Sequence, residues 1–163
     1  MRKWRILILF FILAIAQSTF IQGFRFMGLT PDLMIICAII SGLVFTFDFK
    51  WLIGAALLSA SLKDILSVNY FGLNIFLFVV IALAVARLSR EITLDSLPVQ
   101  MALTFCVCLF YNIAYIIIGA YLGSFISFGM VLRVALLGSV YTALLFPVIF
   151  IAVSGMGLDK AQL

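Results

Sequence analysis

Long apolar runs alternate with short polar breaks along this chain, and the runs lack the alternating polarity of a β-strand. The runs Ile6–Ala16 and Phe76–Ala86, for example, contain no charged residue. A chain inside hydrocarbon must pair every backbone N–H and C=O internally, which only helices and closed β-barrels achieve. Barrel strands alternate between polar and apolar residues. The pattern therefore predicts an all-α integral membrane protein.

The apolar runs predict six membrane-spanning helices. A span needs about 20 residues, or fewer when the helix is short. The expected spans cover approximately residues 6–22, 31–47, 51–68, 72–88, 97–122 and 130–153, within a single polytopic membrane domain of residues 1–163. Only three residues separate the second span from the third, so these two can form a tight helical hairpin. The basic N-terminus followed by an apolar run resembles a secretory signal. Apolar character resumes at Phe20, so we expect an uncleaved first span.

Composition removes the main alternative, a water-soluble domain. Hydrophobic residues make up 67% of the chain and charged residues 10%, whereas soluble domains have about 45–50% and about 25%. One water-exposed domain of this size cannot bury so many apolar side chains. The bilayer must therefore be the solvent for most of the surface.

The basic residues predict the orientation. They are scattered, so the net charge of +4 does not indicate a nucleic-acid partner. Given six spans, one side carries Arg2, Lys3, Arg5, Lys50, Arg87, Arg90 and Lys160, and the other carries Arg25, Lys63 and Arg133. Short loops rich in lysine and arginine stay in the cytoplasm. Both termini are therefore expected in the cytoplasm.

Residues suited to catalysis or to metal binding are few. The chain has no histidine, no G-x-S-x-G sequence and no glycine-rich phosphate loop. Cys37, Cys106 and Cys108 lie within apolar runs, so we interpret them as buried packing residues. We expect neither an enzyme nor a cofactor.

Polar residues gather near the expected outer face of the membrane. They are Arg25, Asp32, Lys63, Asp64, Asn74 and Arg133. They could form a docking rim or the mouth of a cavity. Alternatively, they could be headgroup anchors, snorkelling side chains and helix caps, and we favour this second interpretation for Arg25 and Arg133. Asp32, beside Pro31, is expected to cap the second helix, so Asp32→Asn should be nearly silent.

The adjacent charged residues Lys63 and Asp64 lie where the third helix must either continue or end. The preceding segment Trp51–Leu62 has twelve residues and is too short to span a bilayer alone. Either the third helix continues through the pair, or it ends before the far face. In the first case Asp64 is submerged and should pair with a cation such as Arg25 or Arg133. Adjacent helical residues point about 100° apart, so the two should not pair with each other.

The fifth span carries a stripe of polar residues at four-residue steps. Its members are Gln100, Thr104, Cys108 and Asn112. This intramembrane polar stripe should face other helices, where hydrogen bonds are worth about 0.6–2 kcal/mol each. A ligand pocket would need polar groups from further helices, such as Gln17. We favour helix packing.

Several short motifs occur in the order found in one family of bacterial membrane proteins. Pro31-Asp32-Leu33 opens the second span, small residues from Gly54 lead to Lys63-Asp64, and Gly72-Leu73-Asn74 opens the fourth. Their order, the basic N-terminus and the near absence of loops resemble the MreD family of rod shape-determining proteins. The likeness covers the whole chain. Lys63 departs from the apolar or small residue that the family would place there.

The resemblance implies a non-enzymatic scaffold in the bacterial inner membrane. Such proteins bind the single-span protein MreC and act with actin-like MreB, the glycosyltransferase RodA and a class B penicillin-binding protein. This machinery directs lateral peptidoglycan synthesis and maintains rod shape. The family's six-helix topology is also similar to the substrate-binding S components of energy-coupling-factor transporters. The alternative function is therefore a substrate-binding subunit of a small-molecule transporter.

Overall fold

The fold consists of helices throughout the part of the chain that is described. The computed structural model describes residues 2–19, 30–66, 72–91, 96–122 and 128–155. The helices are α1 (Arg2–Thr19), α2 (Leu33–Val44), α3 (Phe49–Leu66), α4 (Leu73–Glu91), α5 (Leu97–Tyr121), α6 (Phe128–Leu132), the π-helical η2 (Arg133–Leu137) and α7 (Gly138–Gly155). No strand occurs in these ranges, so the expected all-α class is confirmed.

Local sequence signals explain where several helices begin. The Asp32 side chain accepts hydrogen bonds from the first free backbone N–H groups of α2, and Pro98 lies in the first turn of α5. Gly72 precedes α4 with a φ of +93°, a backbone conformation that glycine adopts without a steric penalty. Each of these residues favours the start of a helix at its own position.

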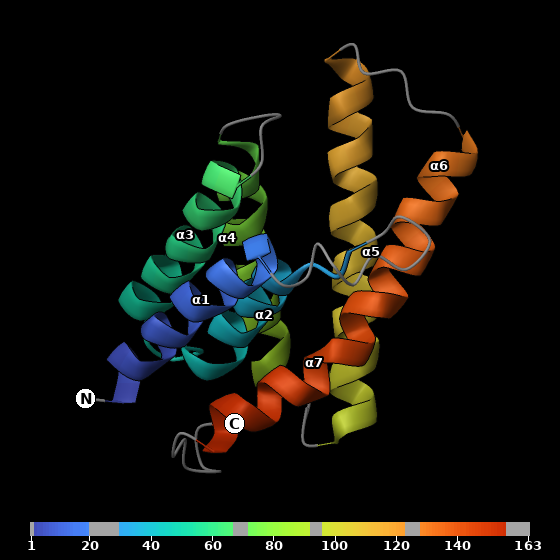
Figure 1. The fold of residues 1–163 in the computed structure, drawn as a ribbon. Coiled ribbons are helices and arrows are strands. Elements are labelled where there is room, and N and C mark those ends of the chain that lie inside the picture. Colours follow the sequence, from blue (N-terminus) through green and yellow to red (C-terminus); the bar gives the residue numbers. More distant parts are fainter. Residues whose placement is uncertain (1, 20–29, 67–71, 92–95, 123–127, 156–163) are drawn as a thin grey trace.

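Helix α2 lies at the centre of the molecule. All twelve of its residues are buried, and it contacts α1, α3, α4, α5 and α7 (Figure 1). At 1.5 Å per residue it is about 18 Å long, which is shorter than the expected span 31–47. The chain leaves the helix at Phe45, and the Thr46 hydroxyl donates hydrogen bonds to the carbonyls of Gly42 and Leu43. An apolar helix that is buried on every side needs neighbours all round.

The other helices form two groups beside α2. Helices α1, α3 and α4 pack on one side, and α5 crosses the continuous helix made by α6, η2 and α7 on the other (Figure 1). The π-helical turns of η2 lie in the middle of that long helix, and Pro147 lies inside α7. Helix α1 begins and α7 ends toward the same, lower part of the view.

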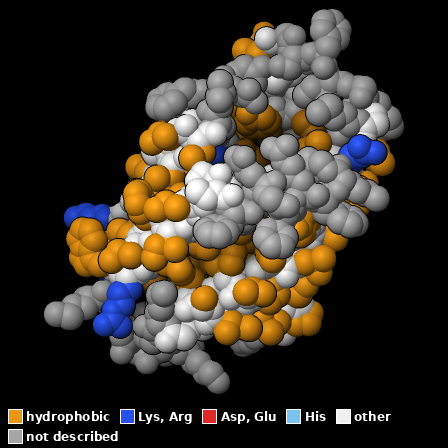
Figure 2. Space-filling model, viewed as in Figure 1, with side chains coloured by type: hydrophobic (Ala, Val, Ile, Leu, Met, Phe, Trp, Pro, Cys, Tyr) orange, Lys and Arg blue, Asp and Glu red, His pale blue; other side chains and the backbone are white. Residues whose placement is uncertain are grey.

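Three helices are long and apolar enough to cross a membrane. They are Leu73–Glu91, Leu97–Tyr121 and Arg133–Gly155. Helices α1 and α3 have 18 residues each, but each carries three charged residues, and α2 is shorter. Hydrophobic side chains cover most of the described surface in Figure 2, with Lys and Arg toward its edges. This surface is consistent with a membrane protein.

Candidate functional site

Polar side chains meet at the end of the bundle where α3 ends and where α2 and α4 begin. Four of the residues predicted from the sequence lie here, namely Asp32, Lys63, Asp64 and Asn74. Tyr111 on α5 joins them. We call these five residues the polar network. The network connects residues that lie up to 79 positions apart in the sequence, from Asp32 to Tyr111.

Asp32 has three functions at the start of α2. Its Oδ1 accepts hydrogen bonds from the backbone N–H groups of Met34, at 3.2 Å, and Ile35, at 3.3 Å. Its Oδ2 forms an ion pair with Lys63. Its own backbone N–H donates to Thr142 Oγ1 on α7 at 3.1 Å. The capping prediction is confirmed. Because Asp32→Asn would also remove the charge opposite Lys63, we now expect this substitution to destabilise the protein rather than to be nearly silent.

Lys63 is held inside the bundle. Its side chain is 14% exposed and that of Asp32 is 21% exposed. The Lys63 ammonium lies 4.2 Å from the ring centroid of Tyr111 and 5.3 Å from that of Phe78. The negative faces of aromatic rings attract cations, and more strongly where water is excluded. Lys63 therefore contacts a carboxylate and two rings instead of extending to lipid headgroups.

Asp64 is buried and hydrogen-bonded by the start of α4. It is 2% exposed, and α3 continues past it to Leu66, which is the first of the two alternatives above. Its Oδ1 accepts from Asn74 Nδ2 at 2.6 Å, and its Oδ2 accepts from the backbone N–H of Gly72 at 2.9 Å. Asn74 Oδ1 in turn accepts from the Tyr111 hydroxyl at 2.5 Å.

The partners observed for Asp64 are Gly72 and Asn74, and Arg133, one of the two expected cations, is not among them. Arg133 is exposed at the start of η2, and no ion pair joins it to Asp64 within the described ranges. That part of the prediction is wrong. Arg25 lies outside the described residues. Lys63 and Asp64 have different partners, as the 100° rule for adjacent helical residues requires.

The intramembrane polar stripe packs against neighbouring helices. Gln100, Thr104 and Cys108 are buried, and Asn112 is half-buried. The Thr104 hydroxyl donates to its own helix, at the carbonyl of Gln100. Asn112 Nδ2 donates to Ser139 Oγ on α7 at 3.2 Å. The stripe is therefore part of the contact between α5 and the rest of the bundle.

The sequence did not indicate two residues that contact the polar network, and the prediction that one cysteine is buried is wrong. Phe78 and Thr142 lie in apolar runs and carry no signal of their own, although Phe78 follows Asn74 by one helical turn and so shares its face. Cys37 and Cys108 are buried as expected, but Cys106 is exposed. An exposed cysteine in an apolar helix is compatible with a lipid-facing position.

Basic and aromatic side chains gather at the opposite end of the bundle. Lys3 forms an ion pair with Asp48 and lies 5.6 Å from the centroid of Trp51. Trp4 meets Trp51 edge to face with a centroid separation of 5.5 Å. Arg90 donates to the backbone carbonyl of Thr46. These contacts join α1, α3, α4 and the α2–α3 connection. The basic residues of these elements at this end are the ones that the sequence analysis assigned to the expected cytoplasmic side.

The side chains of the polar network bond to one another and to the backbone at the starts of α2 and α4, and this arrangement is suited to joining helices. No group of three or more His, Cys, Asp or Glu side chains that could hold a metal ion occurs in the described part of the chain. Comparisons of the chain with protein-family models, with curated proteins and with solved structures find no match.

Proposed function

We propose that this chain is a non-enzymatic membrane scaffold of the MreD type, which binds an MreC-like single-span partner in the bacterial cell-elongation machinery. The observation that carries the proposal is the polar network. The short motifs that bear the resemblance contribute Asp32, Lys63, Asp64 and Asn74, and these four residues meet at one end of the bundle. Residues that lie in the motifs of the resemblance and also meet in space are suited to one shared role.

That shared role is to fix the relative positions of the helices. The network joins α3 to the starts of α2 and α4 and to α5, and Thr142 adds α7. A rigid bundle with almost no soluble part can present a lipid-facing surface of constant shape. Within hydrocarbon a partner helix would bind such a surface by packing and by a few polar contacts.

In this proposal all six helical segments cross the inner membrane, as in the S components of energy-coupling-factor transporters. Both termini lie in the cytoplasm, and the polar network lies toward the outer face. The gathering of Lys3, Trp4, Trp51 and Arg90 at the other end supports this orientation, because basic loops and indole rings favour the cytoplasmic interface. Helix α2, about 18 Å long, would be accommodated by the helices that enclose it.

The polar stripe on α5 supports the scaffold over the transport alternative. A vitamin-binding subunit needs convergent polar groups that are available to a ligand. Gln100, Thr104 and Cys108 are instead buried against the protein itself, and Asn112 donates to Ser139. The same residues thus serve helix packing in the scaffold.

Depletion of the chain in the bacterium that encodes it tests the proposal. We expect rods to become spheres while incorporation of a fluorescent cell-wall precursor along the side wall is lost. Re-expression of the wild type or of Arg87→Gln, an exposed substitution, should restore rods. Cells that stay rod-shaped after depletion but require an added vitamin would replace the scaffold with the transport function.

A further inference from the structure

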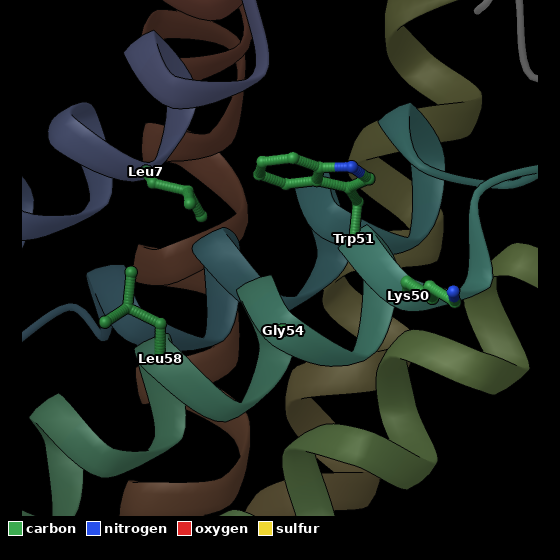
Figure 3. Close-up of a pocket in the computed structure, with 5 residues that line it drawn as sticks. All are labelled: Leu7, Lys50, Trp51, Gly54 and Leu58. Carbon is green, nitrogen blue, oxygen red and sulfur yellow. The ribbon is translucent and has the colours of Figure 1, made fainter.

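An apolar groove lies between α1 and α3, away from the polar network. Its walls are Leu7 on α1 and Trp51 and Leu58 on α3, Gly54 forms its floor, and Lys50 lies at one end (Figure 3). The groove has a volume of about 360 Å³. The Leu7 and Leu58 side chains point toward one another at one end, the Trp51 ring points toward Leu7, and the Lys50 side chain extends away from the opposite end.

Gly54 keeps the groove open. A Cβ atom added at Gly54 would meet no heavy atom within 4 Å. Residues 50, 54 and 58 follow one another at four-residue steps and so form one stripe of α3. At 1.5 Å per residue that stripe is about 12 Å long.

The charge at the Lys50 end has no ion-pair partner among the described residues. Lys3 is paired with Asp48 and Arg87 with Glu91, whereas Lys50 is exposed and takes part in no ion pair among the described residues. Trp51, beside Lys50, also contacts Lys3 and Trp4. Indole rings concentrate at the membrane–water interface, so we expect this end of the groove to lie at headgroup depth.

We propose that the groove binds one acyl chain of an anionic phospholipid, with the lipid phosphate at Lys50. The apolar walls fit a hydrocarbon tail, and a lysine at the mouth fits a headgroup with net negative charge. Basic pockets between membrane helices bind anionic headgroups through this combination. The site is independent of the scaffold function proposed above.

The size of the groove favours a lipid tail over a partner helix. A helix about 10 Å wide, over the same 12 Å of length, occupies roughly 900 Å³, so it would lie across the groove of about 360 Å³ rather than enter it. A single extended chain is much thinner. The tail alone gives no selectivity, since any lipid tail is as apolar as leucine, so the headgroup must supply it.

Native mass spectrometry of the purified full chain, titrated with phosphatidylglycerol or phosphatidylethanolamine, tests the site. One lysine near the membrane surface should give a preference of about fivefold for phosphatidylglycerol. Lys50→Gln should abolish the preference, and Arg87→Gln at the same end should keep it. Gly54→Leu should fill the groove and lower the retention of both lipids. It should not perturb folding, because its Cβ enters open space.

Three outcomes would overturn the proposal. The first is an unchanged preference for phosphatidylglycerol in Lys50→Gln, and the second is unchanged lipid retention in Gly54→Leu. The third comes from a photo-crosslinking residue placed at Leu58 in native membranes. Capture of phospholipid supports the site, whereas capture of a polypeptide would make the groove a docking place for a helix.

Discussion

Lys63 is kept inside an apolar bundle by one carboxylate and two aromatic rings. A buried cation is costly unless it is paired and hydrogen-bonded. Here Asp32 supplies the opposite charge, and Tyr111 and Phe78 supply ring faces. Asp32 in turn caps α2. The ion pair therefore fixes the end of α3 against the start of α2.

A double-mutant cycle should reveal this coupling. Asn is as good a helix cap as Asp, so Asp32→Asn removes the charge and keeps the cap. We expect Asp32→Asn and Lys63→Met each to lower the free energy of unfolding by about 1–3 kcal/mol, because each leaves a partly buried charge without its partner. The double mutant should lose much less than the sum of the two losses. Unfolding in mixed micelles of a mild detergent and sodium dodecyl sulfate would give the free energy of unfolding of the wild type, the two single mutants and the double mutant.

The exposed pair Arg87–Glu91 is a matched control for that cycle. Its side chains are 79% and 59% exposed and lie one helical turn apart. Such pairs are coupled by about 0.3–0.5 kcal/mol. If the Asp32–Lys63 coupling is no larger than that of the control, the pair does not hold α2 and α3 together.

Asp64 and Asn74 permit a test by exchange. Asp64→Ala removes the acceptor of the Gly72 N–H and the Asn74 amide, which should cost about 1–3 kcal/mol of unfolding free energy. Asp64→Asn alone should also destabilise, since one of its two terminal atoms becomes a donor. The exchange Asp64→Asn with Asn74→Asp again gives every donor an acceptor, including the Tyr111 hydroxyl.

The exchange should therefore recover most of the lost stability. Thermal unfolding of the purified variants in detergent would measure this recovery. An exchange mutant that is as unstable as Asp64→Asn would contradict the assigned hydrogen bonds.

The sequence could predict which residues share this end, but not how they pair. Consecutive antiparallel helices place Asp32, Lys63, Asp64 and Asn74 at one end, and this follows from helix order alone. The pairing depends on the rotation of each helix about its axis, which is set by tertiary packing. Tyr111 could not be assigned for that reason, because it lies inside α5 rather than near an end of that helix.

Among the elements, the positions of the helices and most of their lengths were predictable, but the length of α2 was not. Apolar runs mark the helices because continuous hydrophobicity and short polar breaks are strong signals. The expected span had 17 residues, and the observed helix α2 has twelve, five fewer. Its capping and its exit at Phe45 decide the ends, and apolar residues continue beyond them. The π-helical turns of η2 left no mark in the sequence.

Two glycines on neighbouring elements should respond oppositely to alanine. A Cβ at Gly42 on α2 would lie 2.7 Å from the Ala82 carbonyl oxygen and 2.9 Å from the Val85 side chain on α4. Gly42→Ala should push these helices apart and cost about 1–3 kcal/mol of unfolding free energy.

Gly54→Ala is the control for this steric effect. Its Cβ enters open space, so it should be neutral or stabilise by about 0.5–1 kcal/mol through helix propensity. Unfolding in mixed micelles would compare the free energies of unfolding of Gly42→Ala and Gly54→Ala. Equal effects would mean that α2 and α4 do not pack closely at Gly42.

For the whole molecule, the proposed six spans predict which exposed positions face each side of the membrane. Single cysteines can be placed in a background in which Cys37, Cys106 and Cys108 are replaced. Thr30→Cys and Tyr121→Cys should react with a membrane-impermeant maleimide in spheroplasts. Phe49→Cys and Glu91→Cys should react only after permeabilisation. All four wild-type residues are exposed. Labelling of all four in intact spheroplasts would contradict the six-span topology.

The central claim, that this chain is a scaffold for a single-span partner, is tested most directly by recovering its complex. The chain would be tagged at its C-terminus, extracted in mild detergent and analysed for co-purifying proteins by mass spectrometry. The account predicts an MreC-like protein, with or without RodA and a class B penicillin-binding protein. It also predicts more partner with the Asp64/Asn74 exchange than with Asp64→Ala. Recovery of ABC-type ATPases with a coupling membrane subunit, and no MreC-like protein, would contradict it.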